Sequence, residues 1–161
     1  MVAKKYYYVA GAGLLLYLVT ATANKAFAFI TANMKFRGSD AFGSGAFAAS
    51  RSGGTRGHNG VDVVTTVGQA ILSPITGQVT RIAYPYSDDK RYTGLEIVNS
   101  DYKVKLFYVS PTVVIGTPVK AGQKIAIAQN IAAKYGTGMI NHVHIEAYDK
   151  KGNLLNPTNL F

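Results

Sequence analysis

From residue 61 onward, the sequence consists of short segments that are rich in β-branched and aromatic residues and are separated by glycine-containing turns. Such runs are typical of β-strands. The segments with this pattern are 61–67, 70–75, 77–84, 94–100, 103–110, 124–129 and 142–148. No stretch after residue 38 shows a long helical period, and residues 130–136 are expected to form one or two helical turns at most. The pattern therefore predicts a mostly β domain.

Size and composition narrow the possibilities further. The 161 residues have room for one domain with a hydrophobic core and an appendage. Cysteine is absent, so any metal must take nitrogen and oxygen ligands. The formal net charge of +9 suits a polyanionic partner such as nucleic acid, anionic lipid or the bacterial cell wall. Because the basic residues are scattered and no recognition motif is present, we do not expect nucleic-acid binding.

The N-terminal region differs from the rest, because Tyr6 to Ala23 form a run of eighteen residues without a charge. A run of this length is at the lower end of what crosses a bilayer as a helix, and lysines flank it on both sides. The alternative is a secretory signal peptide with a small-residue cleavage site at Ala21-Thr22-Ala23. The run is longer than the apolar part of most signal peptides, which favours one retained transmembrane helix.

These features divide the chain into three parts. Residues 1–36 are predicted to be an N-terminal membrane anchor, and residues 37–57 a Gly/Ser-rich linker that passes into an irregular loop. Residues 58–161 are predicted to be the folded domain.

The three histidines of the chain are its most informative residues. His142 and His144 stand one residue apart in "NHVHIE", and His58 stands in "RGHNGVD". Side chains alternate between the two faces of a strand. His142, His144 and Glu146 are therefore expected to point to one side, while the apolar residues between them face a core.

By the same parity, His58 and Asp62 share a side if their segment is extended, and Gly60 between them keeps that side open. Two imidazoles and one carboxylate on rigid strands suit a catalytic zinc site, with a fourth position left for water. Zinc lowers the pKa of such a water toward ~7 and polarises carbonyl groups, so hydrolysis of an amide is its natural use. The residues alone predict the cluster, but they do not decide which of His142 and His144 binds the metal.

The sequence also contains "GQAILSPITGQV" and "GTPVKAGQKIA" between "HNGVD" and "HVHIE", and it ends in "NPTNLF". In this order the motifs resemble the lysostaphin-type zinc endopeptidases of peptidase family M23, which cut peptide cross-links of bacterial peptidoglycan. The resemblance covers residues 42–161. It implies a compact antiparallel β-sandwich or half-barrel with a duplicated hybrid motif, here preceded by the transmembrane helix.

Carried over position by position, the resemblance implies that His58, Asp62 and His144 bind Zn²⁺. His142 would then be the catalytic histidine that holds or deprotonates the attacking water and stabilises the tetrahedral intermediate. Peptidoglycan peptides would be the substrate.

One position departs from the family pattern. Family members usually carry a second catalytic histidine in a Tyr-x-His-Leu segment, whereas this chain has Tyr108-Val109-Ser110-Pro111. Ser110 occupies the histidine position, and a serine can hydrogen-bond an oxyanion but is a poor general base. Tyr108, or a tyrosine of residues 84–92, would then supply the missing hydrogen-bond donor.

Other residues near these motifs have simpler roles. Glu146 is expected to form a salt bridge rather than to act in catalysis. Arg51 and Arg56 either meet anionic groups of a substrate or are simply solvated. The resemblance implies a cleft wall at Tyr84, Tyr86 and Tyr92.

Two functional hypotheses follow. The first is a membrane-anchored zinc metallopeptidase that hydrolyses peptidoglycan peptides, with its domain facing the cell wall. Such a protein fits a bacterial envelope, and it also fits the virion of a membrane-containing phage as a lytic enzyme. The second is a catalytically impaired domain of the same type that binds the cell wall or acts as a structural component, and Ser110 motivates it.

Overall fold

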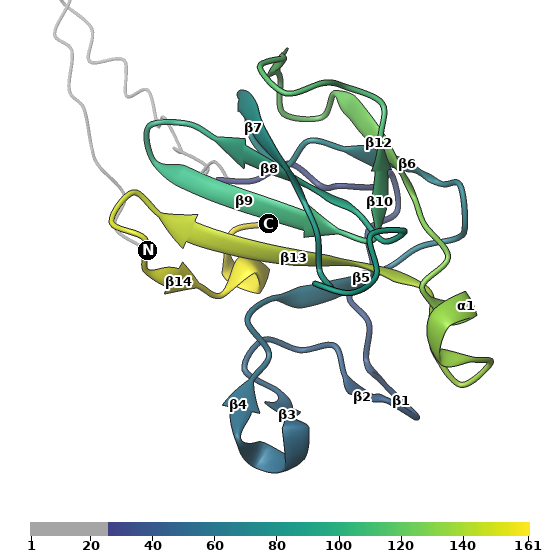
Figure 1. Ribbon diagram of the computed structural model, residues 1–161. Coiled ribbons are helices and arrows are strands. Elements are labelled where there is room, and N and C mark those ends of the chain that lie inside the picture. Colours follow the sequence, from purple (N-terminus) through teal and green to yellow (C-terminus); the bar gives the residue numbers. More distant parts are fainter. Residues whose placement is uncertain (1–25) are drawn as a thin grey trace, which may run out of the picture.

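The computed structural model describes residues 26–161, and strands dominate them (Figure 1). In chain order the elements are β1 (Ser39–Asp40), β2 (Gly43–Ser44), β3 (Ser50–Arg51), the 3-10 helix η1 (Ser52–Gly54), β4 (Arg56–Gly57), β5 (Val61–Val64), β6 (Ala70–Leu72), β7 (Gly77–Ala83), β8 (Gly94–Val98), β9 (Tyr102–Phe107), β10 (Val109–Pro111), β11 (Pro118–Val119), β12 (Lys124–Ala128), α1 (Ala132–Tyr135), β13 (His142–Asp149), β14 (Leu154–Leu155) and the 3-10 helix η2 (Pro157–Asn159).

The strands form two main sheets, in which every pairing is antiparallel. The larger sheet has the order β11-β7-β8-β9-β13-β14, and the smaller sheet has the order β10-β12-β6. One edge of β13 pairs with β9, and the other edge pairs with β5 along residues 142–145 and with β14 along residues 147–148. In Figure 1 the long strand β13 crosses the molecule. Its first residues lie beside β5, and its later residues lie beside β14.

Both sheets contribute side chains to one hydrophobic core. Alternate residues of β13 enter it, because Val143, Ile145 and Ala147 are fully buried. Ile71 of β6 and Ile125 of β12 are the fully buried counterparts on the smaller sheet. Full burial of one such valine, leucine or isoleucine side chain contributes about 1.5–3 kcal/mol relative to exposure. The alternation predicted for the histidine strand is thus confirmed.

The predicted β architecture is confirmed as well. Each of the seven predicted segments contains a strand, and α1 is the short helix of one or two turns expected within residues 130–136. Within residues 26–161, no helix has the length and apolar character needed to cross a bilayer. The run from Tyr6 to Ala23, which was predicted to do so, lies outside the described residues.

Residues 26–37 pack against the domain rather than standing apart from it. Phe27 and Ile30 are buried in the core, and Val64 of β5 donates its backbone N–H to the carbonyl of Lys35. Within the predicted linker, β1 pairs with β2 and β3 pairs with β4. The predicted division of the chain at residues 36 and 57 stays a prediction, but the packed structure includes residues on both sides of each boundary.

Candidate metal centre

Two neighbouring strands place the candidate ligands. His144 of β13 lies directly opposite Asp62 of β5 in the antiparallel register. Directly opposed residues project to the same side of a sheet, so these two side chains meet. His58 precedes β5 and is fixed by two backbone hydrogen bonds of 2.9 Å. Its N–H donates to the Ala49 carbonyl, and its carbonyl accepts from the Ala48 N–H. Residues separated by more than eighty positions in sequence thereby come together.

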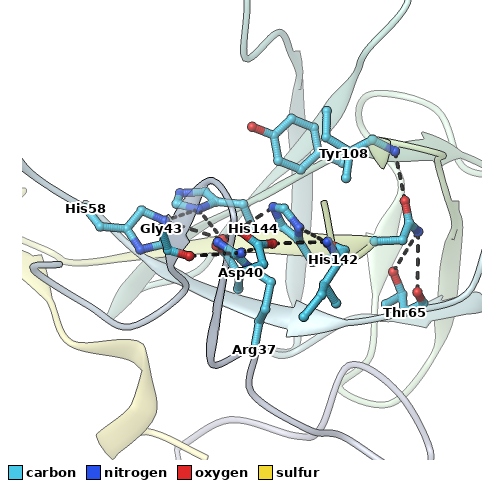
Figure 2. Close-up of polar contacts among 12 residues, drawn as sticks. Arg37, Asp40, Gly43, His58, Thr65, Tyr108, His142 and His144 are labelled. Carbon is cyan, nitrogen blue, oxygen red and sulfur yellow. Dashed lines mark hydrogen bonds and ion pairs between the residues drawn. The ribbon is translucent and has the colours of Figure 1, made fainter. Parts of the chain in front are cut away.

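The three side chains converge on one small volume, and Figure 2 shows two of them, His58 and His144, side by side. Asp62 Oδ1 lies 3.0 Å from His144 Nδ1 and 3.3 Å from His58 Nε2. The two imidazole nitrogens are 2.8 Å apart. Potential ligand atoms of His58, Asp62 and His144 all lie within 4.8 Å of one another. The structure thus brings together the three residues that the resemblance assigned to zinc.

A second set of contacts orients each of these side chains. His58 Nδ1 hydrogen-bonds the carbonyl of Ala46 at 2.8 Å, so its Nε2 faces the cluster. Asp62 Oδ2 accepts hydrogen bonds from Arg37 Nε at 3.1 Å and Nη2 at 2.7 Å, so its Oδ1 faces the cluster. His144 Nε2 lies 3.5 Å from Glu146 Oε1. Two nitrogens and one oxygen, each aimed by an outer partner, fit a zinc ion in both donor type and number.

Electrostatics favours a cation at this point. Burial by itself raises the pKa of the Asp62 carboxyl, but hydrogen bonds with His144 and His58 and the field of His142 lower it far below its usual value of 3.8. Burial opposes the ionisation of Glu146 too, yet His144, Tyr148 and Lys105 lower its pKa to about 2. Both carboxylates are therefore ionised at neutral pH. Glu146 forms the expected salt bridge, with Lys105 Nζ at 3.2 Å.

His142 lies beside the cluster rather than inside it. Its Nδ1 hydrogen-bonds the carbonyl of Ile140 at 2.7 Å, and its Nε2 lies 3.8 Å from Asp62 Oδ1. Burial lowers the pKa of His142, and this effect outweighs the negative charge of Asp62, which by itself would raise that pKa. A neutral ring with its Nδ1 proton donated to a carbonyl leaves Nε2 as a proton acceptor.

Tyr108 reaches the same site, with a strained backbone. Its φ of +66° lies in the left-handed region, which is uncommon for a bulky residue. Its ring packs edge-on against His142, with 5.4 Å between the ring centroids. The hydroxyl of Tyr86 donates to the Tyr108 hydroxyl at 3.2 Å and lies 2.9 Å from the Tyr135 hydroxyl. Because the Tyr108 hydroxyl accepts from Tyr86, its own proton is available to another acceptor.

The cluster opens into a cavity of about 430 Å³. Its lining includes the three histidines, Asp62, Glu146, Tyr108 and several aromatic and basic side chains. Tyr84 and Tyr86 belong to this wall, whereas Tyr92 contacts it indirectly through the ring of Tyr86. Ser110 lies in β10 opposite Ile127 and is not among the lining residues. The structure therefore gathers all of the predicted metal-binding and catalytic residues except Ser110, and the predicted wall tyrosines except Tyr92.

Arg37 is a site residue that the sequence did not indicate. It lies in the predicted Gly/Ser-rich stretch, yet its side chain is buried between Asp62 and Asp40. Its backbone N–H also donates to the Asp62 carbonyl at 2.7 Å. No local sequence signal marks a contact that spans 25 positions.

Gly60 allows the approach of β5 to β13. A Cβ atom at this position would lie 2.0 Å from the carbonyl oxygen of Ile145 and 2.9 Å from Cε1 of His144. No larger residue fits there without moving one strand. The sequence predicted that Gly60 keeps this side of its segment open, but the backbone of β13 fills the space, so the glycine instead permits close packing of the two strands.

Comparison with known proteins agrees with this geometry. The sequence model of peptidase family M23 matches residues 56–157. Leukocyte cell-derived chemotaxin-2 from Mus musculus is 30% identical over 116 residues, which are 71% of this chain and 74% of that protein.

Two solved structures give the same result for the fold. A zinc-containing peptidase from Vibrio cholerae is 27% identical with a TM-score of 0.57, and the match covers 81% of this chain but only 38% of the Vibrio chain. The catalytic domain of the antimicrobial peptidase lysostaphin from Staphylococcus simulans has a TM-score of 0.54 at 19% identity, covering 70% of this chain and 86% of that one. The described domain thus has a lysostaphin-like fold.

Proposed function

Because the chain belongs to peptidase family M23, we propose that it is a zinc-dependent hydrolase of peptide bonds in bacterial peptidoglycan. The observation that carries this proposal is the convergence of His58, Asp62 and His144, with an unprotonated His142 nitrogen beside them. Peptide cross-links of peptidoglycan are the substrates of the family, and the cavity at the cluster is large enough to take part of a peptide.

The ligand set would be His58 Nε2, Asp62 Oδ1 and His144 Nδ1. The chemistry that zinc supplies in such a site is a lowered pKa of water and polarisation of the substrate carbonyl. The protein's own contribution is orientation, because Arg37, Glu146 and the Ala46 carbonyl hold the three ligands in place.

His142 Nε2 would accept the proton of the attacking water. It faces the cluster, and its lowered pKa keeps it neutral and ready to take a proton at neutral pH. After attack, the same nitrogen would return that proton to the leaving amine.

Tyr108 would stabilise the oxyanion of the tetrahedral intermediate. Burial raises the pKa of its hydroxyl to about 12, so it remains a donor at neutral pH. The bond from Tyr86 fixes the hydroxyl without using its proton. Removing one such donor typically costs 10²–10³ in rate in other hydrolases, as in the oxyanion hole of subtilisin. This role would compensate for Ser110, which does not line the cavity.

Mass spectrometry of peptides released from purified peptidoglycan tests the proposal. The full chain, loaded with zinc, is expected to release peptides. His144→Ala removes a proposed ligand and is expected to release none. His142→Ala keeps all three proposed ligands, so it should bind zinc and still release none. Equal release by wild type and His144→Ala would contradict zinc chemistry at this site.

The second candidate is a catalytically impaired domain that binds the cell wall or serves as a structural component of an envelope or virion. Ser110 favours it, since serine stands where the family usually has a catalytic histidine. Its signature is binding of zinc and of peptidoglycan without peptide release. Ser110→His would then be expected to gain activity.

We also propose that residues 6–23 anchor the protein in a membrane, with the domain facing the cell wall. The uncharged run and its flanking lysines support this location. A bacterial envelope and the virion of a membrane-containing phage both suit such an anchored hydrolase.

A further inference from the structure

Two arginines stand opposite each other at the edge of the cavity. Arg51 of β3 and Arg56 of β4 are register partners in the two-stranded β3–β4 hairpin. Both side chains line the cavity that contains the candidate metal ligands. Like charges directly opposite each other destabilise a strand pair. The hairpin therefore carries an unfavourable arrangement at the wall of the site.

No carboxylate of the protein compensates these two charges. All eight Asp and Glu residues of the sequence lie within the described residues, and none forms an ion pair with Arg51 or Arg56. Arg51 donates to the carbonyls of Ser44 at 2.6 Å and Ser50 at 3.1 Å, which fix the guanidinium but carry no charge. The Arg56 side chain has no hydrogen bond within residues 26–161.

The other charged side chains of the cavity are matched. Arg37 pairs with Asp62 and Asp40, and Glu146 pairs with Lys105. The excess positive charge of the wall is therefore concentrated at the β3–β4 hairpin. This hairpin leads directly into His58, since β4 ends at Gly57.

We propose that Arg51 and Arg56 form a binding site for a carboxylate group of the substrate, beside His58. The inference rests on the proposed function, and it narrows the substrate class to peptides that carry a free carboxylate near the bond to be cleaved. Guanidinium groups bind carboxylates with two parallel hydrogen bonds, and two opposed arginines can hold one carboxylate between them. Such a ligand would replace their mutual repulsion with attraction.

A binding experiment tests this site without any turnover. The probes are dansyl-labelled trialanine with a free carboxylate and the same peptide as its carboxamide. Their affinities for the full chain are measured by fluorescence titration, with zinc and after zinc removal by a chelator. We expect the carboxylate peptide to bind at least about tenfold more tightly than the carboxamide peptide. This is the difference in affinity that one charge-assisted hydrogen bond typically gives. The preference should persist without zinc, when no metal can attract the carboxylate.

Matched variants assign the preference to these residues. The double variant Arg51→Gln/Arg56→Gln is expected to bind both peptides equally in the zinc-free state. Arg81→Gln/Lys124→Gln removes the same number of charges from exposed positions outside the cavity and should keep the preference. Arg56→Gln alone breaks no hydrogen bond within the described residues, so it should fold normally and lose part of the preference.

Three results would overturn the proposal. One is equal affinity of the zinc-free wild type for both peptides, and another is an unchanged preference in the double arginine variant. The third is an equal loss of preference in the control pair, which would reflect net charge alone.

Peptide release from peptidoglycan is a separate readout. Carboxylate preference without release would keep this site and reject the hydrolase, whereas release without preference would reject this site alone.

Discussion

At the scale of single residues, one buried guanidinium links two parts of the site. Arg37 is 4% exposed and donates to Asp62, a candidate ligand, and to Asp40. Asp40 in turn accepts the backbone N–H of Ile140 at 3.0 Å, and the Ile140 carbonyl holds the ring of His142. The orientation of the proposed base and of the proposed ligand thus depends on the same arginine.

This arrangement predicts a pH dependence of stability. Burial alone would raise the pKa of Asp40, but the N–H groups of Ile140 and Phe42 and the charge of Arg37 lower it below its usual value of 3.8. A carboxyl whose pKa is depressed by folding stabilises the native state above its unfolded pKa, and this contribution is lost as pH falls. Urea unfolding of zinc-free wild type should therefore show a steeper loss of stability between about pH 5 and pH 3 than Asp40→Asn. Parallel pH profiles for the two proteins would refute the role of Asp40.

Glu146 offers a second prediction, because its carboxylate is aimed at His144. Its Oε2 accepts from the Tyr148 hydroxyl at 2.7 Å and from Lys105, while its Oε1 faces His144 Nε2. Loss of such an outer partner typically weakens metal binding by about 10–100-fold. Glu146→Gln should show this loss in a chelator competition assay.

Glu96→Gln is the matched control for that variant. Glu96 and Glu146 are both register partners of Lys105, but Glu96 pairs with Arg81 and does not line the cavity. Its substitution should leave zinc affinity unchanged. A similar loss in both variants would mean that sheet stability, rather than the orientation of His144, limits metal binding.

At the scale of elements, the strands of the domain were predictable because their residues alternate. Val143, Ile145 and Ala147 are buried in the core while His144 and Glu146 face the cavity, and this alternation follows from the period of two alone. The pairing of β13 with both β5 and β9 was not predictable, since register depends on hydrogen bonds between distant segments.

The short strands within residues 37–57 could not be predicted from the sequence, for a different reason. Their glycines and serines predicted an irregular linker, yet they form β1–β2 and β3–β4 and cover the free edge of β5. Backbone contacts such as Asp62 N–H to the Gly45 carbonyl at 2.9 Å define this segment. Contacts made by the backbone leave no trace in side-chain patterning, so propensity could not reveal them.

The approach of β5 to β13 can be tested at Gly60. Because a Cβ atom there would meet the Ile145 carbonyl at 2.0 Å, Gly60→Ala should separate the strands that carry Asp62 and His144. We expect a loss of stability of about 2 kcal/mol or more, together with weaker zinc binding. Urea unfolding and chelator competition measure the two effects.

Gly38→Ala is the appropriate comparison, because a Cβ atom at Gly38 has no atom within 4 Å. That variant should unfold like wild type or slightly later, since alanine restricts the unfolded chain more than glycine does. Equal behaviour of the two variants would show that the strands adapt to a side chain at Gly60.

At the scale of the whole molecule, the histidine motifs predicted the location of the candidate metal site, whereas composition only limited the types of metal ligand and the class of partner. Three ligand candidates were brought together as expected, because a metal site requires specific donors at specific strand positions. The membrane segment stays a prediction, since it lies outside the described residues. Ser110 shows the limit of carrying a motif over by position, because the residue matching the family's histidine does not reach the cavity.

Membrane anchoring predicts a simple fractionation result. The full chain should sediment with membranes after high-salt washing and be released by detergent. A chain of residues 26–161 keeps Phe27 and Ile30 in the core, so it should stay folded and remain in the supernatant. Release of the full chain by salt alone would indicate that its positive charge, rather than residues 6–23, holds it at the membrane.

The two ends of the described domain lie side by side. The backbone N–H of Phe27 donates to the Leu160 carbonyl at 2.9 Å, and the rings of Phe27 and Phe161 pack with 5.5 Å between centroids. Termini that lie close together are the condition under which circular permutation is tolerated. A circularly permuted gene could join these ends with a short linker and open the chain at the exposed turn near Gly116. Such a protein would keep the same cavity lining with new chain ends, which makes the domain a natural candidate for insertion into other scaffolds.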